Sequence, residues 1–113
     1  VGPYSQAVCA GPFLFISGQL GLLPDKKELA GNDIKEQTQQ AMENVAAVLD
    51  AGGSTLDQIL KVTVYLRDMG DFSDFNEVYS TFFEDDPPAR AAVGVSSLPL
   101  DALVELDVIA LRD

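Results

Sequence analysis

The chain has 113 residues, with 18 acidic against 7 basic side chains, a formal net charge of −11 and 47% hydrophobic residues. This size and composition predict one domain, residues 1–113, that can bury its own core without a metal or disulfide. Histidine is absent, which excludes Ser-His and Cys-His nucleophile pairs and zinc sites that need imidazole, and the scattered Lys and Arg residues argue against nucleic acid as a partner.

The single cysteine, Cys9, cannot form an internal disulfide, which is typical of a reduced, cytoplasmic protein. The longest apolar runs fall far short of the ~20 residues that cross a bilayer, so we expect no membrane-spanning segment. No leader sequence is visible, and the start at Val1 rather than Met indicates a trimmed N-terminus. Any chemistry must use carboxylates, hydroxyls, backbone groups or ordered water, and no cofactor is predicted.

Two strands are predicted near the start of the chain. Residues 13–16 form an apolar run between Gly-Pro and Ser-Gly pairs, as expected of a short buried strand. Residues 20–23 are expected to continue the sheet, and Pro24-Asp25 to turn the chain.

A long amphipathic helix is predicted over residues 33–51, because apolar side chains recur there at helical spacing. Asn32 or Asp33 can cap its start, and Gly52-Gly53 supplies a left-handed stop. Residues 54–57 resemble a capping box and should open a short helical turn.

The second half of the chain predicts a strand over residues 61–66, a helix over 71–83 and strands over 91–95 and 103–111. The helix carries an aromatic stripe that we interpret as core packing: Phe72, Phe75, Tyr79 and Phe82. The complete order of strands and helices predicts an α+β domain with both helices packed on one face of a single sheet.

The last strand has two unusual faces. Val104, Leu106, Val108 and Ala110 form an apolar face that should meet the helices. The opposite face mixes large aliphatic side chains with two carboxylates: Leu103, Glu105, Asp107, Ile109 and Leu111. We expect another copy of the chain to cover this face, the alternative being ordinary isolated surface aliphatics.

In the preceding strand we expect Ala91, Val93 and Val95 to face the core and Arg90, Ala92 and Gly94 to face away. The small residues beside Arg90 should open a concave space next to a cationic fork that suits a planar carboxylate. The alternative is a surface ion pair between Arg90 and Glu105 or Asp107.

A carboxylate that faces an interface is the second candidate functional group. Burial would raise the pKa of Glu105 or Asp107 and allow proton exchange near neutral pH. The alternative is a carboxylate held ionised by Arg90 or by backbone amides.

The chain resembles the RidA (YjgF/UK114) family over essentially its whole length, through successive motifs in the right order. These motifs are Gly2-Pro3-Tyr4-Ser5-Gln6-Ala7, Ser17-Gly18-Gln19, Asp71-Phe72 with Asn76 and Tyr79, Pro88-Ala89-Arg90, and residues 104–110. The resemblance implies a chorismate-mutase-like fold with a mixed sheet. It also implies a homotrimer with three intersubunit clefts and no cofactor, which hydrolyses 2-imino acids or enamines, such as 2-iminobutanoate and 2-iminopropanoate, to 2-oxo acids and ammonia.

The resemblance also implies roles for individual residues. Arg90 matches the clamp for the substrate carboxylate, Glu105 the acid that positions or activates water, and Tyr4 a tyrosine that lines the cleft; we predict these three as catalytic. Asn76 matches an asparagine beside the ligand, and Ser17 and Gly18 match the pocket wall.

Several departures from the family pattern affect this interpretation. Ala92 stands where many members have a cysteine, so only its backbone can contact a substrate, and Gly94 replaces a larger polar residue, which should enlarge or loosen the pocket. The segment 84–88 is shorter than in the archetype, and the family's strand upstream of the Gly-Pro-Tyr motif is missing.

A second function class remains open: a trimeric regulatory or binding protein that uses the same cleft for a small carboxylate without turnover. A third, RNA cleavage, is disfavoured by the net charge of −11 and the absence of histidine.

Overall fold

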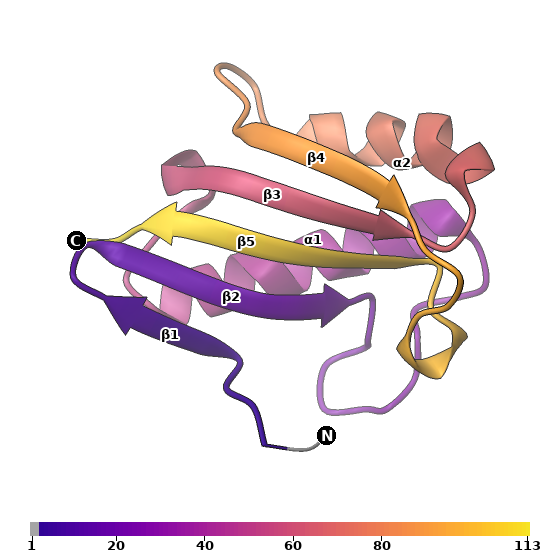
Figure 1. Cartoon of the computed structure of the whole chain (residues 1–113), viewed down its shortest axis with the longest axis horizontal. Helices are drawn as coiled ribbons and strands as arrows, with labels where there is room; N and C mark the ends of the chain where they lie inside the picture. The colour runs from indigo at the N-terminus through magenta and orange to yellow at the C-terminus, as the bar shows by residue number, and fades with distance from the viewer. Residues whose placement is uncertain (1–2) are drawn as a thin grey trace.

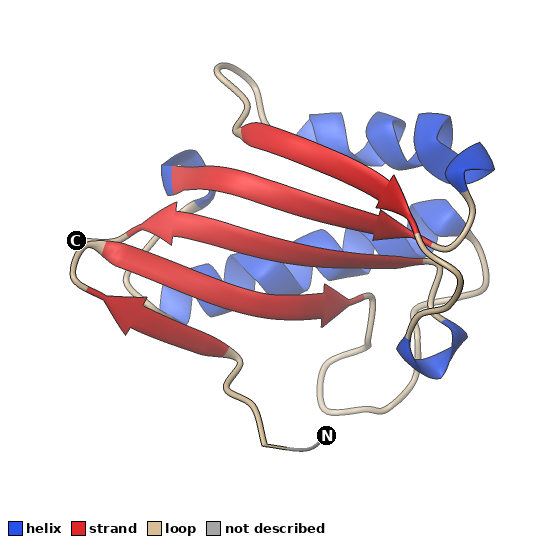
Figure 2. Cartoon of the chain, viewed as in Figure 1, coloured by secondary structure: helices blue, strands red, loops and turns tan. Residues whose placement is uncertain are grey.

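Five β-strands form a single mixed sheet, and two α-helices cover one of its faces (Figures 1 and 2). The computed structural model describes residues 3–113. The strands are β1 (Ala7–Ala10), β2 (Phe13–Leu20), β3 (Ile59–Leu66), β4 (Ala89–Gly94) and β5 (Val104–Leu111), and the helices are α1 (Ile34–Ala51) and α2 (Phe72–Tyr79). The order in the sheet is β1-β2-β5-β3-β4, and only β3 and β4 pair in parallel. The predicted α+β fold is confirmed. The face without helices, which is turned toward the viewer in Figure 1, is called the open face below.

The start of the sheet differs from the prediction. The run over residues 13–16 extends to Leu20, and its hairpin partner is β1 rather than residues 20–23. Beyond Leu20 only an isolated bridge joins Leu22 to Leu29. The sequence of β1 has small residues and no apolar alternation, so periodicity does not reveal it. Gly11, at a φ of 58°, makes the tight turn that returns the chain into β2.

Helix α1 begins and ends as predicted. The side chain of Asp33 accepts a hydrogen bond of 2.8 Å from the backbone N–H of Glu36, and Gly53 has the left-handed φ of 81° that ends the helix. The buried side of α1 packs Ala41, Val45 and Leu49 against the sheet. Among residues 3–113, no helix is long and apolar enough to span a lipid bilayer.

The core lies between the helices and the sheet. In β5 the side chains alternate as predicted: Val104, Leu106, Val108 and Ala110 are buried, whereas Glu105, Asp107 and Ile109 are half-buried on the open face. Helix α2 ends at Tyr79 and continues as a 3₁₀ turn over Ser80–Phe82, so the predicted helix is about one turn too long. The prediction that its aromatic stripe packs in the core is confirmed.

The face assignment for β4 is wrong. The parallel register places Val62 opposite Arg90 and Val64 opposite Ala92, so Arg90 and Ala92 share the helix side of the sheet. Ala92 packs against the core, whereas Val93 is 43% exposed on the open face. The strand contains only small residues apart from one Arg and one Val, and the open face is itself apolar. Side-chain size therefore does not indicate which face is buried.

Candidate functional site

The predicted site residues fall into two clusters on opposite faces of the sheet. Arg90, Asn76 and Ala92 lie on the helix side, at the edge formed by β4 and α2. Glu105 and Gly18 lie together on the open face. Strand β3 separates β4 from β5, so one chain does not bring Arg90 and Glu105 to the same ligand.

Helix α2 holds the guanidinium of Arg90. Nη1 of Arg90 donates a hydrogen bond of 2.5 Å to Oδ1 of Asn76. The guanidinium carbon lies 5.3 Å from the ring centre of Phe72, 5.9 Å from that of Phe75 and 4.9 Å from that of Tyr79. These distances are within the range of cation–π attraction. The aromatic stripe therefore orients the cation as well as packing the core, and Arg90 remains exposed at its edge.

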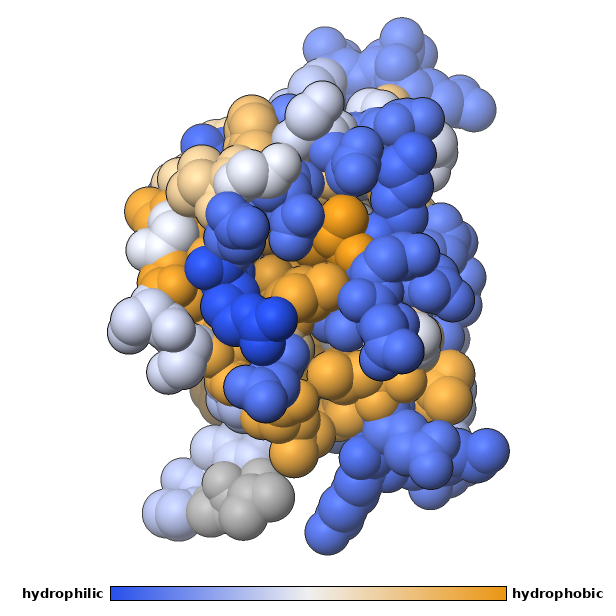
Figure 3. Space-filling model, turned by 90° about the vertical axis from the view of Figure 1, so that its right-hand side faces the viewer, coloured by the Kyte–Doolittle hydropathy of each residue, from blue (hydrophilic) through white to orange (hydrophobic). Residues whose placement is uncertain are grey.

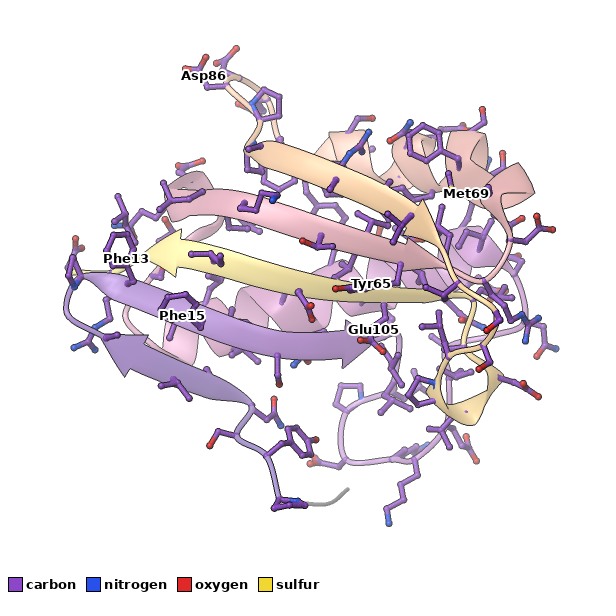
Figure 4. The ribbon with its side chains drawn as sticks, in the orientation of Figure 1. Phe13, Phe15, Tyr65, Met69, Asp86 and Glu105 are labelled. Carbon is purple, nitrogen blue, oxygen red and sulfur yellow. The ribbon has the colours of Figure 1, made fainter. Side chains whose placement is uncertain are left out.

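A pocket of about 680 Å³ opens beside this guanidinium. Arg90 and Asn76 line it together with Tyr79 and the double proline Pro87-Pro88, which belongs to the loop that projects at Asp86 in Figure 4. A planar cation with several donors is suited to bind a carboxylate through two parallel hydrogen bonds. This edge of the molecule can therefore bind a small organic anion.

The small residues of β4 do not create this space. The side chain of Met69 already occupies the volume at Gly94, where an added β-carbon would lie 2.9 Å from its Cγ. Ala92 packs toward the core. The expectation that Gly94 enlarges the pocket is therefore wrong, and α2 and the segment before β4 form the pocket instead. The Glu105 and Asp107 carboxylates lie on the other face, so the ion pair with Arg90 that the sequence left open does not form within the chain.

The second cluster surrounds Glu105. Its side chain lies against the backbone of Gly18, where any β-carbon would overlap the carboxylate. Burial, and then the negative charge of Asp107, raise the pKa of Glu105. A carboxyl group with a raised pKa can exchange a proton closer to neutral pH than an ordinary glutamate.

Tyr65 joins this cluster, although no sequence motif singled it out. Its hydroxyl donates a hydrogen bond of 3.0 Å to Oδ2 of Asp107. That bond, followed by the charge of Asp107, burial and the charge of Glu105, raises the pKa of Tyr65. Figure 4 shows Tyr65 and Glu105 at one end of the open face and Phe13 and Phe15 at the other. Only the pairing of β3 with β5 reveals this contact.

Tyr4 belongs to the segment that leads from the N-terminus into β1, and Ser17 lies in β2 and holds the end of this segment. The hydroxyl and the backbone N–H of Ser17 both donate to the carbonyl oxygen of Gln6, at 3.1 and 2.9 Å. These bonds fix Gln6 against β2. Tyr4 itself is 60% exposed and belongs to neither cluster. Gly2 of the Gly-Pro-Tyr motif lies outside the described residues.

The rest of the open face is apolar for a surface. Phe13, Phe15 and Val93 are each at least 40% exposed, and Phe15 and Ile109 line a shallow hollow of about 510 Å³ beside Gly18 and Asp107. Figure 3 views the molecule from its side, and hydrophobic patches reach the surface on the left, the side that faces the viewer in Figure 1. Exposed apolar patches of this kind on a small domain are typical of a protein interface.

The sequence and the fold both match known proteins. The model of the protein family described as Endoribonuclease L-PSP matches residues 1–112. A RutC family protein of Pyrococcus horikoshii is 51% identical over 113 residues, which cover 100% of this chain and 90% of that protein. The crystal structure of RidA from the Antarctic bacterium Psychrobacter sp. is 42% identical, with a TM-score of 0.94, over 98% of this chain and 89% of that one. The crystal structure of Escherichia coli TdcF with bound serine is 38% identical, with a TM-score of 0.94, over 100% of this chain and 91% of that one.

Proposed function

Because this chain belongs to the RidA (YjgF/UK114) family, we propose that it is a homotrimeric deaminase that hydrolyses 2-imino acids, or their enamine tautomers, to 2-oxo acids and ammonia. One observation carries the proposal. The Arg90 guanidinium, which suits a carboxylate, and the Glu105 carboxyl group, which suits proton exchange, are both held in place, but on opposite faces of one sheet. A second copy of the chain is needed to bring them together.

The open face supports this assembly. Its apolar side chains gain free energy when another copy covers them, at roughly 25 cal/mol for each Å² removed from water. Packing of copies in a closed ring would place the Arg90 edge of one copy against the Glu105 end of the next. Each cleft would then hold Arg90 and Asn76 from one subunit, with Glu105, Gly18 and Tyr4 from its neighbour.

In this cleft Arg90 would bind the substrate carboxylate and fix the position of the imine carbon. Water attacks the carbon of the protonated imine while the Glu105 carboxylate accepts a proton from that water, which gives a neutral tetrahedral carbinolamine. Glu105 then gives this proton to the nitrogen. As the C–N bond breaks, the carbinolamine hydroxyl gives its proton back to the Glu105 carboxylate, and ammonia and the 2-oxo acid leave. Positioning and proton transfer can each contribute several kcal/mol, which suits a reaction whose substrate is already electrophilic.

Binding without turnover is the second candidate. The solved structure of TdcF contains bound serine, a small carboxylate ligand. The Arg90 pocket supplies a fork for such a ligand without any contribution from Glu105. In this case the protein would sense a small carboxylate, and Ala92 in place of a cysteine would matter little.

One assay separates the two candidates. An imino acid is generated in situ from an amino acid, and the release of 2-oxo acid and ammonia is followed with wild type, Arg90→Ala, Glu105→Ala and the remote control Asp50→Asn. The deaminase proposal expects acceleration by wild type and by the control, and a loss of roughly tenfold or more in both site variants. Saturable binding of 2-oxobutanoate without acceleration would favour the binding protein. Equal rates for wild type and Arg90→Ala would refute the clamp.

A further inference from the structure

Two carboxyl groups on the open face stand in different surroundings. Glu105 and Asp107 project from the same face of β5, about 7 Å apart along the strand. Tyr65 on β3 is paired with Glu105 in the register, but its hydroxyl donates to Asp107. Within residues 3–113 the structure shows no hydrogen bond to the carboxylate of Glu105. The two carboxyl groups are therefore neighbours, but among residues 3–113 Asp107 has a hydrogen-bond donor and Glu105 has none.

We propose that Tyr65 and Asp107 act as a positioning pair for the proposed reaction: the Tyr65 hydroxyl holds the Asp107 carboxylate in one position beside Glu105, and Glu105 is the carboxyl group that carries the exchangeable proton. The role in turnover rests on the proposed function. The effect of the pair on the titration of Glu105 does not, because it is a property of the protein without substrate.

The hydrogen bond holds the Asp107 carboxylate in place beside Glu105. A hydroxyl that donates to a carboxylate stabilises the charged form of that carboxylate. Once Asp107 is charged, its field disfavours a second negative charge nearby, in agreement with the raised pKa of Glu105. Without the tyrosine hydroxyl the Asp107 carboxylate would be free to change its distance from Glu105.

Few other ionisable groups act on Glu105. Strand β2 has none, and the only one in β4, Arg90, lies on the other side of the sheet. Lys61 on β3 faces the open side and lines the same hollow as Asp107. In the proposed trimer a neighbouring copy would add its own Arg90, whose charge would act in every variant alike.

Gly18 completes the arrangement. Its missing side chain lets the Glu105 carboxylate lie directly against the β2 backbone. Glu105 is thereby confined by β2 on one side, while Tyr65 and Asp107 set its electrostatics from β3 and β5. A catalytic role is assigned to Glu105 alone; Tyr65 and Asp107 act through it.

The test is a pH titration of the intact protein, followed by ¹³C NMR of labelled glutamate carboxyl carbons, with Glu105→Gln used to assign the Glu105 signal. The variants are Tyr65→Phe, Asp107→Asn and Asp107→Glu, and Asp50→Asn on α1 is the control with the same change of charge.

We expect Asp107→Asn to lower the titration midpoint of Glu105 by roughly half to one and a half pH units. Tyr65→Phe should lower it by less, because the Asp107 carboxylate is then no longer held in one position beside Glu105. Asp107→Glu, which keeps the charge, should restore most of the midpoint, and Asp50→Asn should leave it unchanged.

An unchanged Glu105 midpoint in Asp107→Asn, or an equal shift in Asp50→Asn, would overturn the pairing. An unchanged curve in Tyr65→Phe would overturn the role of Tyr65. If the protein hydrolyses imines, the acid limb of the kcat/KM profile should follow the same order of variants, and a profile that ignores it would overturn the positioning role. Absence of turnover in wild type would refute the proposed function, and the titration would still decide which carboxyl group carries the proton.

Discussion

Gly18 lies so close to Glu105 that a β-carbon at position 18 would overlap the carboxylate oxygen Oε2. The contact joins β2 to β5 across the open face, and it involves the end of a flexible side chain rather than backbone. A larger residue at position 18 would therefore be accommodated by movement of Glu105 and not by a change in the fold.

Gly18→Ala is expected to leave stability within about 1 kcal/mol of wild type, because the carboxylate can swing away. Imine hydrolysis should fall by roughly tenfold or more, because the displaced carboxylate no longer reaches the reacting atoms. Gly11→Ala is the matched control: its β-carbon meets nothing within 4 Å, but its φ of 58° costs about 1 kcal/mol in a residue with a side chain. The expected pattern is lost activity in the first variant and lost stability in the second, measured by turnover and urea unfolding. Full activity in Gly18→Ala would contradict the position assigned to Glu105.

Asn76→Ala removes the acceptor that holds the Arg90 guanidinium. The cation would then sample other orientations, and we expect the Kd for 2-oxobutanoate, measured by calorimetry, to rise about tenfold, since a hydrogen bond to a charged group contributes ~1.5 kcal/mol. Asp74→Ala, on the exposed side of the same helix, should bind as wild type does. Equal weakening in both variants would show that the loss comes from a general change in α2 and not from this contact.

Gln37 is a buried polar residue that ties α1 to two loops. Its side chain accepts a hydrogen bond of 2.8 Å from the backbone N–H of Leu103 and donates one of 3.2 Å to the carbonyl of Gly31. Gln37→Leu keeps the volume but leaves both backbone groups unpaired, so unfolding should become easier by about 2–4 kcal/mol. Gln39→Leu, which breaks only an exposed contact to Glu43, should change stability by less than about 0.5 kcal/mol. A small effect at Gln37 would mean that water replaces both bonds.

Strong alternation made some elements predictable from the sequence. In β5 large aliphatic residues alternate with carboxylates, and the core face and the unusual open face could both be assigned. In α1 the helical period and its caps defined the element to within a residue. In β4, by contrast, Ala, Gly and a lone Val carry no contrast in size, and the inferred faces were reversed.

The site required information that no local pattern carries. The residues Arg90 and Glu105 could be identified from motifs, but their placement on opposite faces depends on sheet order and register. The contact between Tyr65 and Asp107 spans 42 positions in the sequence. The aromatic rings that contact Arg90 belong to α2, whereas Arg90 lies on β4, later in the chain. The spacing of these rings in the sequence could therefore indicate only core packing.

Glu105 makes stability depend on pH. Because its pKa is raised in the folded protein, the folded state holds this proton more tightly than the unfolded state. The resulting stabilisation is fully present below the ordinary glutamate pKa and is lost as pH rises through the raised value.

Glu105→Gln removes the charge that the fold disfavours. The variant should be more stable than wild type at pH 7 by roughly a few tenths of a kcal/mol, allowing for solvent screening, and the difference should vanish near pH 4. Denaturant unfolding at the two pH values measures this, and a difference of the opposite sign at pH 7 would show that Glu105 is stabilised in its charged form.

The proposed assembly of three copies depends on the open face. Phe15 is 43% exposed at the apolar end of this face and lines the hollow beside Gly18. Phe15→Asp would place a charge where the proposed trimer excludes water, a cost of several kcal/mol for each subunit. Ala47→Asp adds the same charge on the exposed side of α1, across the sheet from this face. Sedimentation should show wild type and Ala47→Asp at three times the chain mass of 12.1 kDa, and Phe15→Asp as a single chain.

Because one chain keeps Arg90 and Glu105 apart, Phe15→Asp should also lose imine hydrolysis while it still binds a carboxylate weakly at Arg90. A folded single chain that hydrolyses imines at the wild-type rate would refute a site shared between copies.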